Sequence, residues 1–571
     1  MLTFLLPLCA LASYFQNRDL LLTLFPFLAI APLVMIMIPR ARNGKDGIFM
    51  VLILSVSMAL LMSATFSSTR LLGWDIHGEY LVFQQVMKSF HWQPELSLQY
   101  NSVTSVTLLP AVLSVATSLD GIQIFKFVYP ILYSVLPVVL YRLYRRILPA
   151  EAALLAVFLF IGYPSFYIDL TAIARQEIAE ILLALALCVL IDNRYHNLRG
   201  RLVLLLLSVG IVMSHYSVAY LYIAILIFSY LILRRETLQL ADLTTTVAVI
   251  LIGSTWYIFV TGGGEIRTVT LYISTVASGV FLDFFSPFSR PSAVIQALGL
   301  ASTGLGILHE LNRLTSYLVV LAIFSGFALL VLEKRKEVVR TRMLVVACFG
   351  IVLLISAVAL PYFAGGLNLS RLYHIALIFV SPCFAYGIMG FVPKLQSIAT
   401  RIHPSWPRLS KRTVYLIGAT LLLSYFLFNS GWVWAVSGGS PTSVLLDPQR
   451  MLHSQQPALQ AWVMSYYVPG QDAAGAQWLS KYHASNIFIC ADLDAQYNAL
   501  TSYGGFPREP PKLPDYCNFE RSYVFLRLLN TEYGVGSYYS TEWRVSEIYP
   551  NLITMERVYS NGGATIYAPD M

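Results

Sequence analysis

The feature that most constrains this chain is a series of apolar runs, most of them long enough to cross a lipid bilayer. A membrane-spanning helix needs ~20 predominantly apolar residues. Only 12% of the 571 residues are charged, about half the share found in ordinary soluble domains. Thirteen runs can be identified, at about residues 1–15, 20–38, 48–66, 122–141, 150–168, 174–191, 202–214, 217–233, 243–260, 316–332, 343–361, 372–392 and 413–430. The sequence therefore predicts a polytopic α-helical membrane protein with about 13 transmembrane helices.

The positions of Lys and Arg predict its orientation. Alternate connections hold 21 of these residues, whereas the connections between them hold seven. Basic connections stay in the cytoplasm. The basic set is 39–47, 142–149, 192–201, 234–242, 333–342 and 393–412. We therefore expect a multi-pass protein of the cell (plasma) membrane whose N-terminus is cytoplasmic and whose C-terminal part is extracytoplasmic.

The composition changes near residue 430, which predicts two domains. Residues 1–430 form the transmembrane module, with two long outer loops at 67–121 and 261–315. Residues 431–571 are polar, rich in aromatic residues and punctuated by Gly and Pro, which suits an extracytoplasmic α+β domain. Its expected elements are a helix at 472–482 and strands at 486–489, 523–528 and 564–568.

The outer loops contain apolar segments that the orientation does not allow to span. We expect residues 79–90 and 104–118 to form helices in the outer interface, and residues 280–285 to touch the membrane surface. In the C-terminal domain, Cys490 and Cys517 can form a disulfide if that domain lies outside the cytoplasm.

The segment Trp74-Asp75-Ile76-His77-Gly78-Glu79-Tyr80 follows the third run and is the first candidate site. Asp75 has two interpretations: a helix N-cap, or a carboxylate that accepts a proton or binds a divalent cation. Glu79 lies four residues on and would share its helical face. His77 is the least specific member, since a lone His is more often structural.

Further ionisable residues lie at the outer ends of the spans. Arg175 and Glu177 open the sixth span, where the alternatives are an internal ion pair and a site facing a cavity. His215 and Tyr216 lie at a break between two runs, which is tolerated where it lines protein or a wet cavity. Arg371 and His374 open the twelfth span; they suit a phosphate, although Arg371 is equally interpretable as an interfacial anchor. Together these residues predict one polar chamber that opens outward.

The sequence contains no Walker, dinucleotide-binding, HExxH or CxxC motif, so no nucleotide cofactor is expected. The net charge of +8 is explained by the basic connections, and no nucleic-acid partner is expected.

This pattern resembles the GT-C superfamily of integral membrane glycosyltransferases, and is closest to an uncharacterised prokaryotic branch of it. The resemblance rests on the architecture and on the segments 74–80, 174–177, 214–217, 370–374 and 558–567. The superfamily's second acidic site has no clean match, and only Glu265 and Asp283 are candidates for it. The chain lacks the WWDYG-type signature of oligosaccharyltransferases. It also lacks the Asp-Glu pair of protein O-mannosyltransferases, unless Glu79 replaces it.

The resemblance implies a glycosyltransferase that moves a monosaccharide from a polyprenyl-phosphate donor to an extracytoplasmic glycan, lipid or protein, inverting the anomeric centre. Asp75 would be the base or a metal-linked carboxylate, with Glu79 as the candidate second carboxylate, and Mg or Mn would be the candidate metal. Arg371, with Arg175 or His374, would bind the donor phosphate. The alternatives are a lipid-linked sugar transporter or flippase, and an O-antigen polymerase or ligase of another fold.

Overall fold

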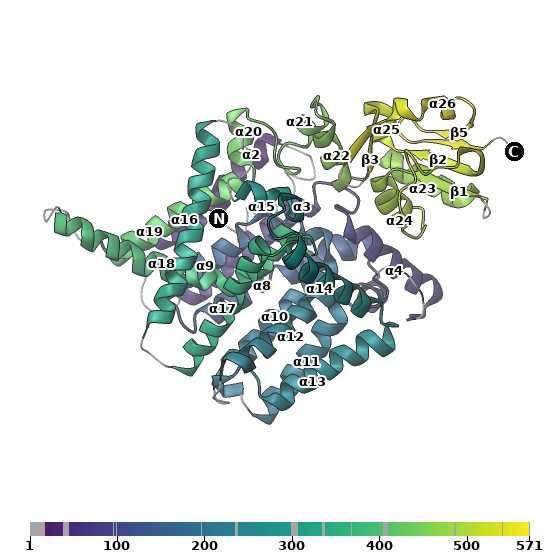
Figure 1. Ribbon diagram of the computed structural model, residues 1–571. Helices are drawn as coiled ribbons and strands as arrows, with labels where there is room; N and C mark the ends of the chain where they lie inside the picture. The colour runs from purple at the N-terminus through teal and green to yellow at the C-terminus, as the bar shows by residue number, and fades with distance from the viewer. Residues whose placement is uncertain are drawn as a thin grey trace.

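The computed structural model describes residues 18–37, 45–94, 96, 98, 100–195, 197–233, 238–297, 306–333, 337–366, 368–402, 409–484, 487–538 and 541–569. Among these residues, the regular elements as far as Ser437 are all helices, and every strand lies between residues 488 and 568. Figure 1 shows the strands gathered at one side of the molecule, next to α4 (Asp75–Ser89). The predicted division at residue 430 stays a prediction.

The helical part follows the apolar runs closely. Each of the twelve predicted runs from 20–38 onward has helix in the structure, whereas the run 1–15 lies outside the described residues. The helices before the first outer segment and up to the sixth run are α2 (Arg18–Met37), α3 (Lys45–Thr65), α5 (Leu108–Thr117), α6 (Gly121–Gln123), α7 (Tyr129–Tyr133), α8 (Leu136–Tyr144), α9 (Ala150–Ile161) and α10 (Ala174–Ile191). The remaining ones are α11 (Leu198–Ser214), α12 (Tyr216–Ile232), α13 (Leu243–Thr255), α14 (Gly264–Leu282), α15 (Ser292–Ala297), α16 (Ile307–Leu332), α17 (Val338–Ala359), α18 (Leu369–Ile402), α19 (Lys411–Asn429) and α20 (Trp432–Ser437).

Within the described residues, eight helices are long and apolar enough to cross a membrane, or nine if one bent pair is a single span. The chain is therefore a multi-pass membrane protein, and the count of thirteen stays a prediction. Three of the predicted spans that the structure describes, α10, α11 and α12, are absent even from these nine. α10 carries Arg175, Glu177 and Glu180 near its start, and all three side chains are buried. Its charges therefore face protein, not lipid.

The bent pair shapes one wall of the site described below. After α9 the chain turns by 73° into two short 3-10 helices, η2 (Pro164–Phe166) and η3 (Leu170–Ala172). Pro164 explains the break, because a proline cannot donate the next helical hydrogen bond. The connection from α9 to α10 thus folds back over the end of the bundle.

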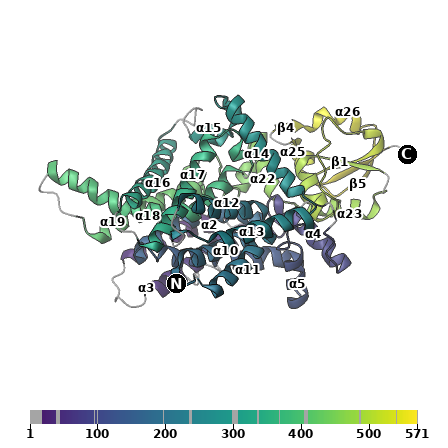
Figure 2. The ribbon, with the colours of Figure 1, turned by 60° about the horizontal axis from the view of Figure 1, so that its bottom comes forward.

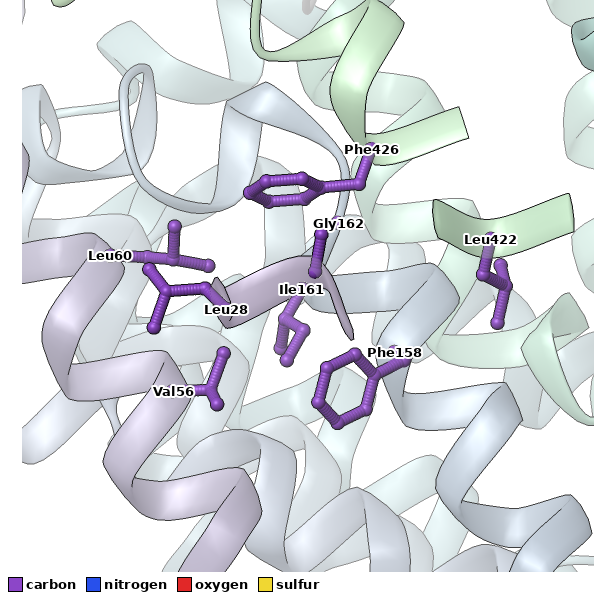
Figure 3. Close-up of a pocket in the computed structure, with 9 residues that line it drawn as sticks. Leu28, Val56, Leu60, Phe158, Ile161, Gly162, Leu422 and Phe426 are labelled. Carbon is purple, nitrogen blue, oxygen red and sulfur yellow. The ribbon is translucent and has the colours of Figure 1, made fainter. Parts of the chain in front are cut away.

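The membrane-type core is closely packed. Between α2, α3, α9 and α19 the chain leaves a void of about 10 Å³, lined by apolar residues such as Leu28, Val56, Phe158 and Leu422 (Figure 3). A volume of this size holds about one water molecule. Because the lining offers no polar side chain, this void is a packing defect and not a ligand site.

Helices α16 and α18 approach through small residues. A Cβ atom added to Gly326 of α16 would lie 1.7 Å from the carbonyl oxygen of Cys383, and one added to Gly387 of α18 would lie 1.9 Å from the carbonyl oxygen of Ala322. Small residues at such positions allow helix backbones to touch, which is a main source of packing energy in membranes.

The outer segments form helices as expected. Residues 79–90 lie almost wholly in α4, and residues 104–118 contain α5, which is too short to span a bilayer. Phe281, in the last turn of α14, and Phe285, just after that helix, are 87% and 93% exposed. Exposed aromatic side chains of this kind suit a membrane surface, and that placement stays a prediction.

The C-terminal region contains a four-stranded sheet of order β1-β2-β6-β5 and a separate hairpin, β3-β4. β1 (Phe488–Ala491) pairs parallel with β2 (Ser522–Leu526), and the other pairings are antiparallel. The remaining strands are β3 (Val535–Tyr538), β4 (Thr541–Arg544), β5 (Glu556–Ser560) and β6 (Thr565–Ala568). The helices are α21 (Pro448–Leu452), α22 (Pro457–Tyr466), α23 (Gly470–Tyr482), α24 (Leu500–Ser502), α25 (Leu528–Tyr533) and α26 (Tyr549–Leu552).

The sequence predictions for this region agree with the structure. The expected helix at 472–482 is α23, and the three expected strands correspond to β1, β2 and β6, shifted by one or two residues. Asn486, the predicted start of the first strand, lies outside the described residues. A disulfide joins Cys490 and Cys517, which confirms the pairing that the sequence allows.

Replacing Gly326 with Ala tests the contact between α16 and α18. The added methyl group meets backbone, which cannot rotate away, so we expect a loss of about 1–3 kcal/mol in the free energy of unfolding. The measurement is the unfolding temperature of the purified protein in detergent. Gly47→Ala is the matched control, since its Cβ meets nothing within 4 Å and should leave that temperature unchanged or slightly higher. Equal temperatures for the two variants would contradict the close approach.

Candidate active site

Asp75 is the first residue of α4, and its carboxylate accepts hydrogen bonds from three side chains. The hydroxyl of Tyr100 donates to Oδ1 at 2.9 Å. Arg175 and Arg371 donate to Oδ2, at 3.0 Å and 3.2 Å. Trp74 occupies the N-cap position, and no side chain caps the helix. The geometry therefore favours the interpretation of Asp75 as a site carboxylate over that of a helix cap.

Arg175, at the start of α10, joins two carboxylates of α4. It also donates to Oε1 of Glu79, and Oε2 of Glu79 accepts the backbone N–H of Ala174 at 2.9 Å. Asp75 and Glu79 lie one helical turn apart, so that one guanidinium can reach both. The Arg175 and Glu79 side chains are 3% and 0% exposed, and charges buried to this degree persist only when paired and hydrogen-bonded. Arg175 thus forms an internal ion pair, which is one of the two alternatives that the sequence leaves open.

Asp75 and Arg371 face a cleft of about 210 Å³. Its other lining residues are Gly73, Trp74, Asp169, Ala172, Ile173, Asn368, Ser465 and Tyr466. The Arg371 side chain is 23% exposed, compared with 3% for Arg175. The cleft therefore presents the paired carboxylate of Asp75 and guanidinium of Arg371 to a ligand, with the guanidinium of Arg175 behind them.

Asp169 is a second carboxylate of the cleft, and the sequence analysis missed it. It lies between η2 and η3, where Oδ2 accepts from the Ser370 hydroxyl at 2.8 Å and Oδ1 accepts from the Tyr466 hydroxyl at 3.1 Å. One signal pointed to it: residue 169 opens the connection that the charge pattern places on the same side as Asp75. An ionisable residue at the end of a membrane segment is a candidate functional residue.

The guanidinium groups around Asp75 determine its ionisation. Burial raises the pKa of this carboxyl, but Arg175, Arg371 and Arg508 together bring the pKa below its ordinary value. In Glu79, burial raises the pKa to about 7, against the opposing effect of Arg175 and with a smaller contribution from Asp75. Asp75 is therefore ionised at neutral pH, whereas Glu79 titrates near neutrality.

His77 connects α4 to the C-terminal region. Its Nδ1 is hydrogen-bonded to the hydroxyl of Ser502 in α24, and the side chain is fully buried. Burial and the nearby Arg508 lower the pKa of His77 to about 3. The ring is therefore neutral at physiological pH and is absent from the cleft lining, which suits a structural role.

His374 does not lie beside Arg371 as the sequence analysis expected. Its ring is fully buried, with its centroid 4.3 Å from that of Phe160, and its Nδ1 lies 3.8 Å from Oε2 of Glu180. The helical spacing correctly places both residues near the start of α18, but apolar packing against α9 draws the ring into the bundle. Glu177, also buried, lies in this deeper layer and not in the cleft lining.

His215 and Tyr216 lie at the break between α11 and α12. Nδ1 of His215 accepts the backbone N–H of Val218 at 3.4 Å and so caps α12. The two rings lie 5.2 Å apart, and His215 is close enough to Arg175 and Arg371 to experience their charge. This pair borders the ion-pair cluster and is absent from the cleft lining.

Glu265 and Asp283 do not lie in the cleft. Glu265 accepts hydrogen bonds from Ser102 and Thr261, and Asp283 accepts one from Tyr362 at 3.0 Å. Both therefore join outer segments to one another. The second acidic residue of the cleft is Asp169.

The C-terminal region lies next to α4, the helix that begins with Asp75 (Figure 2). The indole N–H of Trp74 donates to Oδ1 of Asp494 at 2.7 Å, and its ring stacks on Tyr497 at 5.3 Å. Arg508 donates to the carbonyl of Trp74, and its guanidinium lies 5.6 Å from the ring centroid of Tyr100. The backbone N–H of Gly73 donates to the Tyr466 carbonyl at 2.8 Å. Asp494, Tyr497, Arg508 and Tyr466 were not identified from the sequence.

Asp494 is itself fixed by a buried ion-pair cluster. Arg527 donates to Oδ2 of Asp492 at 2.9 Å and to Oδ2 of Asp494 at 2.8 Å. Next to them, Asp472 accepts the backbone N–H of Leu528 at 2.7 Å. All four charged side chains are buried, so the anchor of Trp74 is rigid.

The residues around Asp75 do not fit the divalent metal that the family resemblance implies. Both carboxylate oxygens already accept hydrogen bonds, and two of the three donors are guanidinium groups that would repel a cation. Within the described part of the chain, no group of three or more His, Cys, Asp and Glu side chains could hold a metal ion.

A family model described as a predicted membrane protein (DUF2206) matches residues 200–567, well over half of the chain. The chain belongs to this family. No protein of curated function matches it.

Solved GT-C glycosyltransferases resemble the chain in structure. The apo oligosaccharyltransferase of Archaeoglobus fulgidus has a TM-score of 0.50 at 13% identity, over 93% of this chain and 75% of that one. ArnT from Cupriavidus metallidurans, in the apo state, has a TM-score of 0.47 at 11% identity, over 92% and 98%. Arabinofuranosyltransferase AftD from Mycobacteria has 0.48 at 13% identity, over 91% and 40%. The first likeness shows a shared fold, which confirms the GT-C architecture predicted from the sequence.

Gly73→Ala tests how closely the segment before α4 approaches the connection before α10. Gly73 has a φ of +96°, and an added Cβ would lie 2.2 Å from Cβ of Ala172. Overpacking typically costs ~1–3 kcal/mol, so we expect a clear fall in the unfolding temperature measured in detergent. Gly438→Ala is the matched control, since its φ is +72° and its Cβ would meet nothing within 4 Å. An equal fall in both variants would attribute the effect to backbone strain alone and contradict the clash.

Asp472→Asn tests the buried cluster through pH. Burial raises the pKa of Asp472 to about 7, so the folded state holds its proton more tightly than the unfolded chain. Stability from this group is therefore present below pH ~4 and is lost as the pH rises through 7. We expect the Asn variant to unfold at a higher temperature than the wild type at pH 8, with the difference vanishing near pH 4. A difference that is constant over this range would contradict the assignment.

Proposed function

We propose that this protein is an inverting glycosyltransferase that moves a monosaccharide from a polyprenyl-phosphate carrier to an acceptor hydroxyl at the extracytoplasmic side of the membrane. The shared GT-C fold supports a glycosyltransferase. The single observation that carries the proposal is the ion pair between Asp75 and Arg371, which faces the cleft with an Oδ2–Nη1 distance of 3.2 Å. It brings together a proton acceptor and a phosphate ligand, the two groups that this transfer needs.

Arg371 is the group that would bind the donor phosphate. Its guanidinium donates a hydrogen bond to Asp75, and its side chain is partly exposed. A phosphate oxygen in the cleft would form a charge-assisted hydrogen bond with it. Arg175, buried between two carboxylates, would stay in place and preserve the position of Asp75.

Asp75 would take the proton of the acceptor. As the acceptor oxygen bonds to the anomeric carbon, its proton passes to the carboxylate of Asp75, and the bond from that carbon to the phosphate oxygen breaks. The electron pair of this bond leaves with the polyprenyl phosphate, whose growing charge Arg371 would stabilise. Attack opposite the leaving group inverts the anomeric centre.

The donor would also prepare the base. In the structure, Arg371 is one of three guanidinium groups that lower the pKa of Asp75. When Arg371 turns to the phosphate, Asp75 loses one cationic partner and gains the influence of an anion. Both changes raise its proton affinity. Donor binding would therefore convert a weak base into a stronger one at the moment of transfer.

The direct test uses purified protein in nanodiscs with a lipid extract that contains polyprenyl-phosphate sugars. Mass spectrometry would follow the loss of the sugar-linked lipid and the release of polyprenyl phosphate. Release that depends on the protein and is abolished in Asp75→Asn supports the proposal. Undiminished release in a correctly folded Asp75→Asn variant would refute the role of Asp75. Movement of intact lipid-linked sugar across vesicles without covalent change would instead identify a flippase.

Two variants separate binding from chemistry. Arg371→Met removes the phosphate ligand, so we expect its Kd for polyprenyl phosphate to rise about tenfold or more, as for the loss of one charged hydrogen bond. Asp75→Asn removes the competing carboxylate, so it should bind polyprenyl phosphate as tightly as the wild type or more tightly. The measurement is binding by microscale thermophoresis. Arg313→Gln, which removes an exposed cation paired with Glu310, is the control and should behave as the wild type. Weaker binding in Asp75→Asn would contradict the exchange of partners.

A further inference from the structure

A second cavity lies at the other end of α10 from Asp75. Its volume is about 500 Å³, and its wall includes the last turn of α10 and the first turns of α11, α13 and α17. α10 ends at Ile191, so this end is roughly 24 Å along the helix axis from Arg175. The distance approaches the thickness of a bilayer core, which places the cavity near the opposite membrane boundary.

One wall of this cavity is formed by Arg342 of α17, which is 1% exposed. Its Nε donates to the Gln239 carbonyl at 3.1 Å, and its Nη1 donates to Oδ1 of Asn193 at 3.0 Å. These neutral oxygens come from two connections that are distant in the sequence. They fix the plane of the guanidinium before any ligand arrives, which is the arrangement that suits recognition of a phosphate.

Arg201 supplies a second cation. It lies in the first turn of α11, forms an ion pair with Asp242 at 2.6 Å, and has a side chain that is 55% exposed. The cavity lining therefore carries two guanidinium groups and one carboxylate. Asn193 and Thr245 add neutral hydrogen-bonding groups to the same lining.

The connections that contribute lining residues are basic in sequence. The connections 192–201, 234–242 and 333–342, which contain or adjoin these lining residues, hold ten Lys and Arg but five Asp and Glu. Their positive charge is the reason that the sequence predicts them to be cytoplasmic. Basic pockets between helices on that side of a membrane bind the head groups of anionic lipids. The volume also falls within the ~300–1,000 Å³ of ligand pockets.

We propose that this cavity binds a phosphate group, carried either by an anionic phospholipid or by free inorganic phosphate. Arg342 would be the fixed ligand at the wall, and Arg201 the accessible ligand at the mouth. The site is separate from the cleft at Asp75, and the proposal does not depend on the function assigned to that cleft.

The test is native mass spectrometry of the delipidated full-length protein with phosphatidylglycerol or phosphatidylcholine added at equal concentration. We expect the wild type to retain phosphatidylglycerol in preference. A cation near a membrane surface is worth ~1 kcal/mol toward an anionic lipid, or about fivefold in affinity. Arg201→Gln should therefore weaken retention about fivefold, and Arg342→Gln at least as much. Arg201 is exposed, so its variant keeps the test valid if Arg342→Gln does not fold.

Two controls isolate the cavity. Arg340→Gln removes a cation from the same turn of α17, but Arg340 pairs with Glu333 and is not part of the lining. Arg313→Gln removes an exposed cation that pairs with Glu310 and is not part of the lining. Both variants should retain phosphatidylglycerol as the wild type does. A loss in Arg340→Gln as large as that in Arg201→Gln would overturn the proposal, because surface charge alone would then explain binding.

A second arm distinguishes the two sources of phosphate. Inorganic phosphate is added to the lipid-free protein while the unfolding temperature is measured. A rise that Arg201→Gln abolishes assigns the site to free phosphate. Selective retention of phosphatidylglycerol without such a rise assigns it to a lipid head group. Equal retention of the two lipids by the wild type, together with no effect of inorganic phosphate, would overturn the proposal.

Discussion

The site depends on one buried arrangement of charge, the guanidinium of Arg175 held between Asp75 and Glu79. A carboxylate buried alone among helices costs several kcal/mol. α4 can therefore dock against α10 only because α10 begins with a cation that satisfies both acids. α10 itself carries three charged residues, Arg175, Glu177 and Glu180, and all three side chains are buried. They face protein and not lipid, so that the helix does not have to present an apolar surface all round.

The C-terminal region completes this arrangement from outside the helices. Asp494 and Tyr497 hold Trp74, the residue directly before Asp75. Arg508 adds a third positive charge near the carboxylate. The ionisation of Asp75 thus depends on a residue more than 400 positions later in the chain. Whatever moves this region relative to α4 would change both the position of Asp75 and its proton affinity, so the region belongs to the site electrostatically as well as mechanically.

Hydropathy and charge allowed the helical runs, the C-terminal strands and the clustering of Asp75, Arg175 and Arg371 to be predicted from the sequence. These features follow from local composition, which a bilayer constrains strongly. Asp169 and Arg508 were missed because the sequence around them resembles that of ordinary loops, and only the position of residue 169 in a connection on the same side as Asp75 pointed to the first. The bend after α9 brings Asp169 to the cleft, and the docking of the C-terminal region brings Arg508 close to Asp75. His374 was misplaced for the converse reason: helical spacing gives a face, but packing against Phe160 decides where the ring points.

Burial then separates two arginines that the sequence treats alike. Both Arg175 and Arg371 contact Oδ2 of Asp75, and either could have been the phosphate ligand. Removing a guanidinium from two buried carboxylates leaves uncompensated charge and costs ~3–5 kcal/mol, whereas a partly exposed pair is worth far less because water replaces the lost contact. In the proposed function, an incoming phosphate would therefore compete for Arg371 but not for Arg175. That difference between a framework arginine and a ligand arginine would follow from solvent access alone.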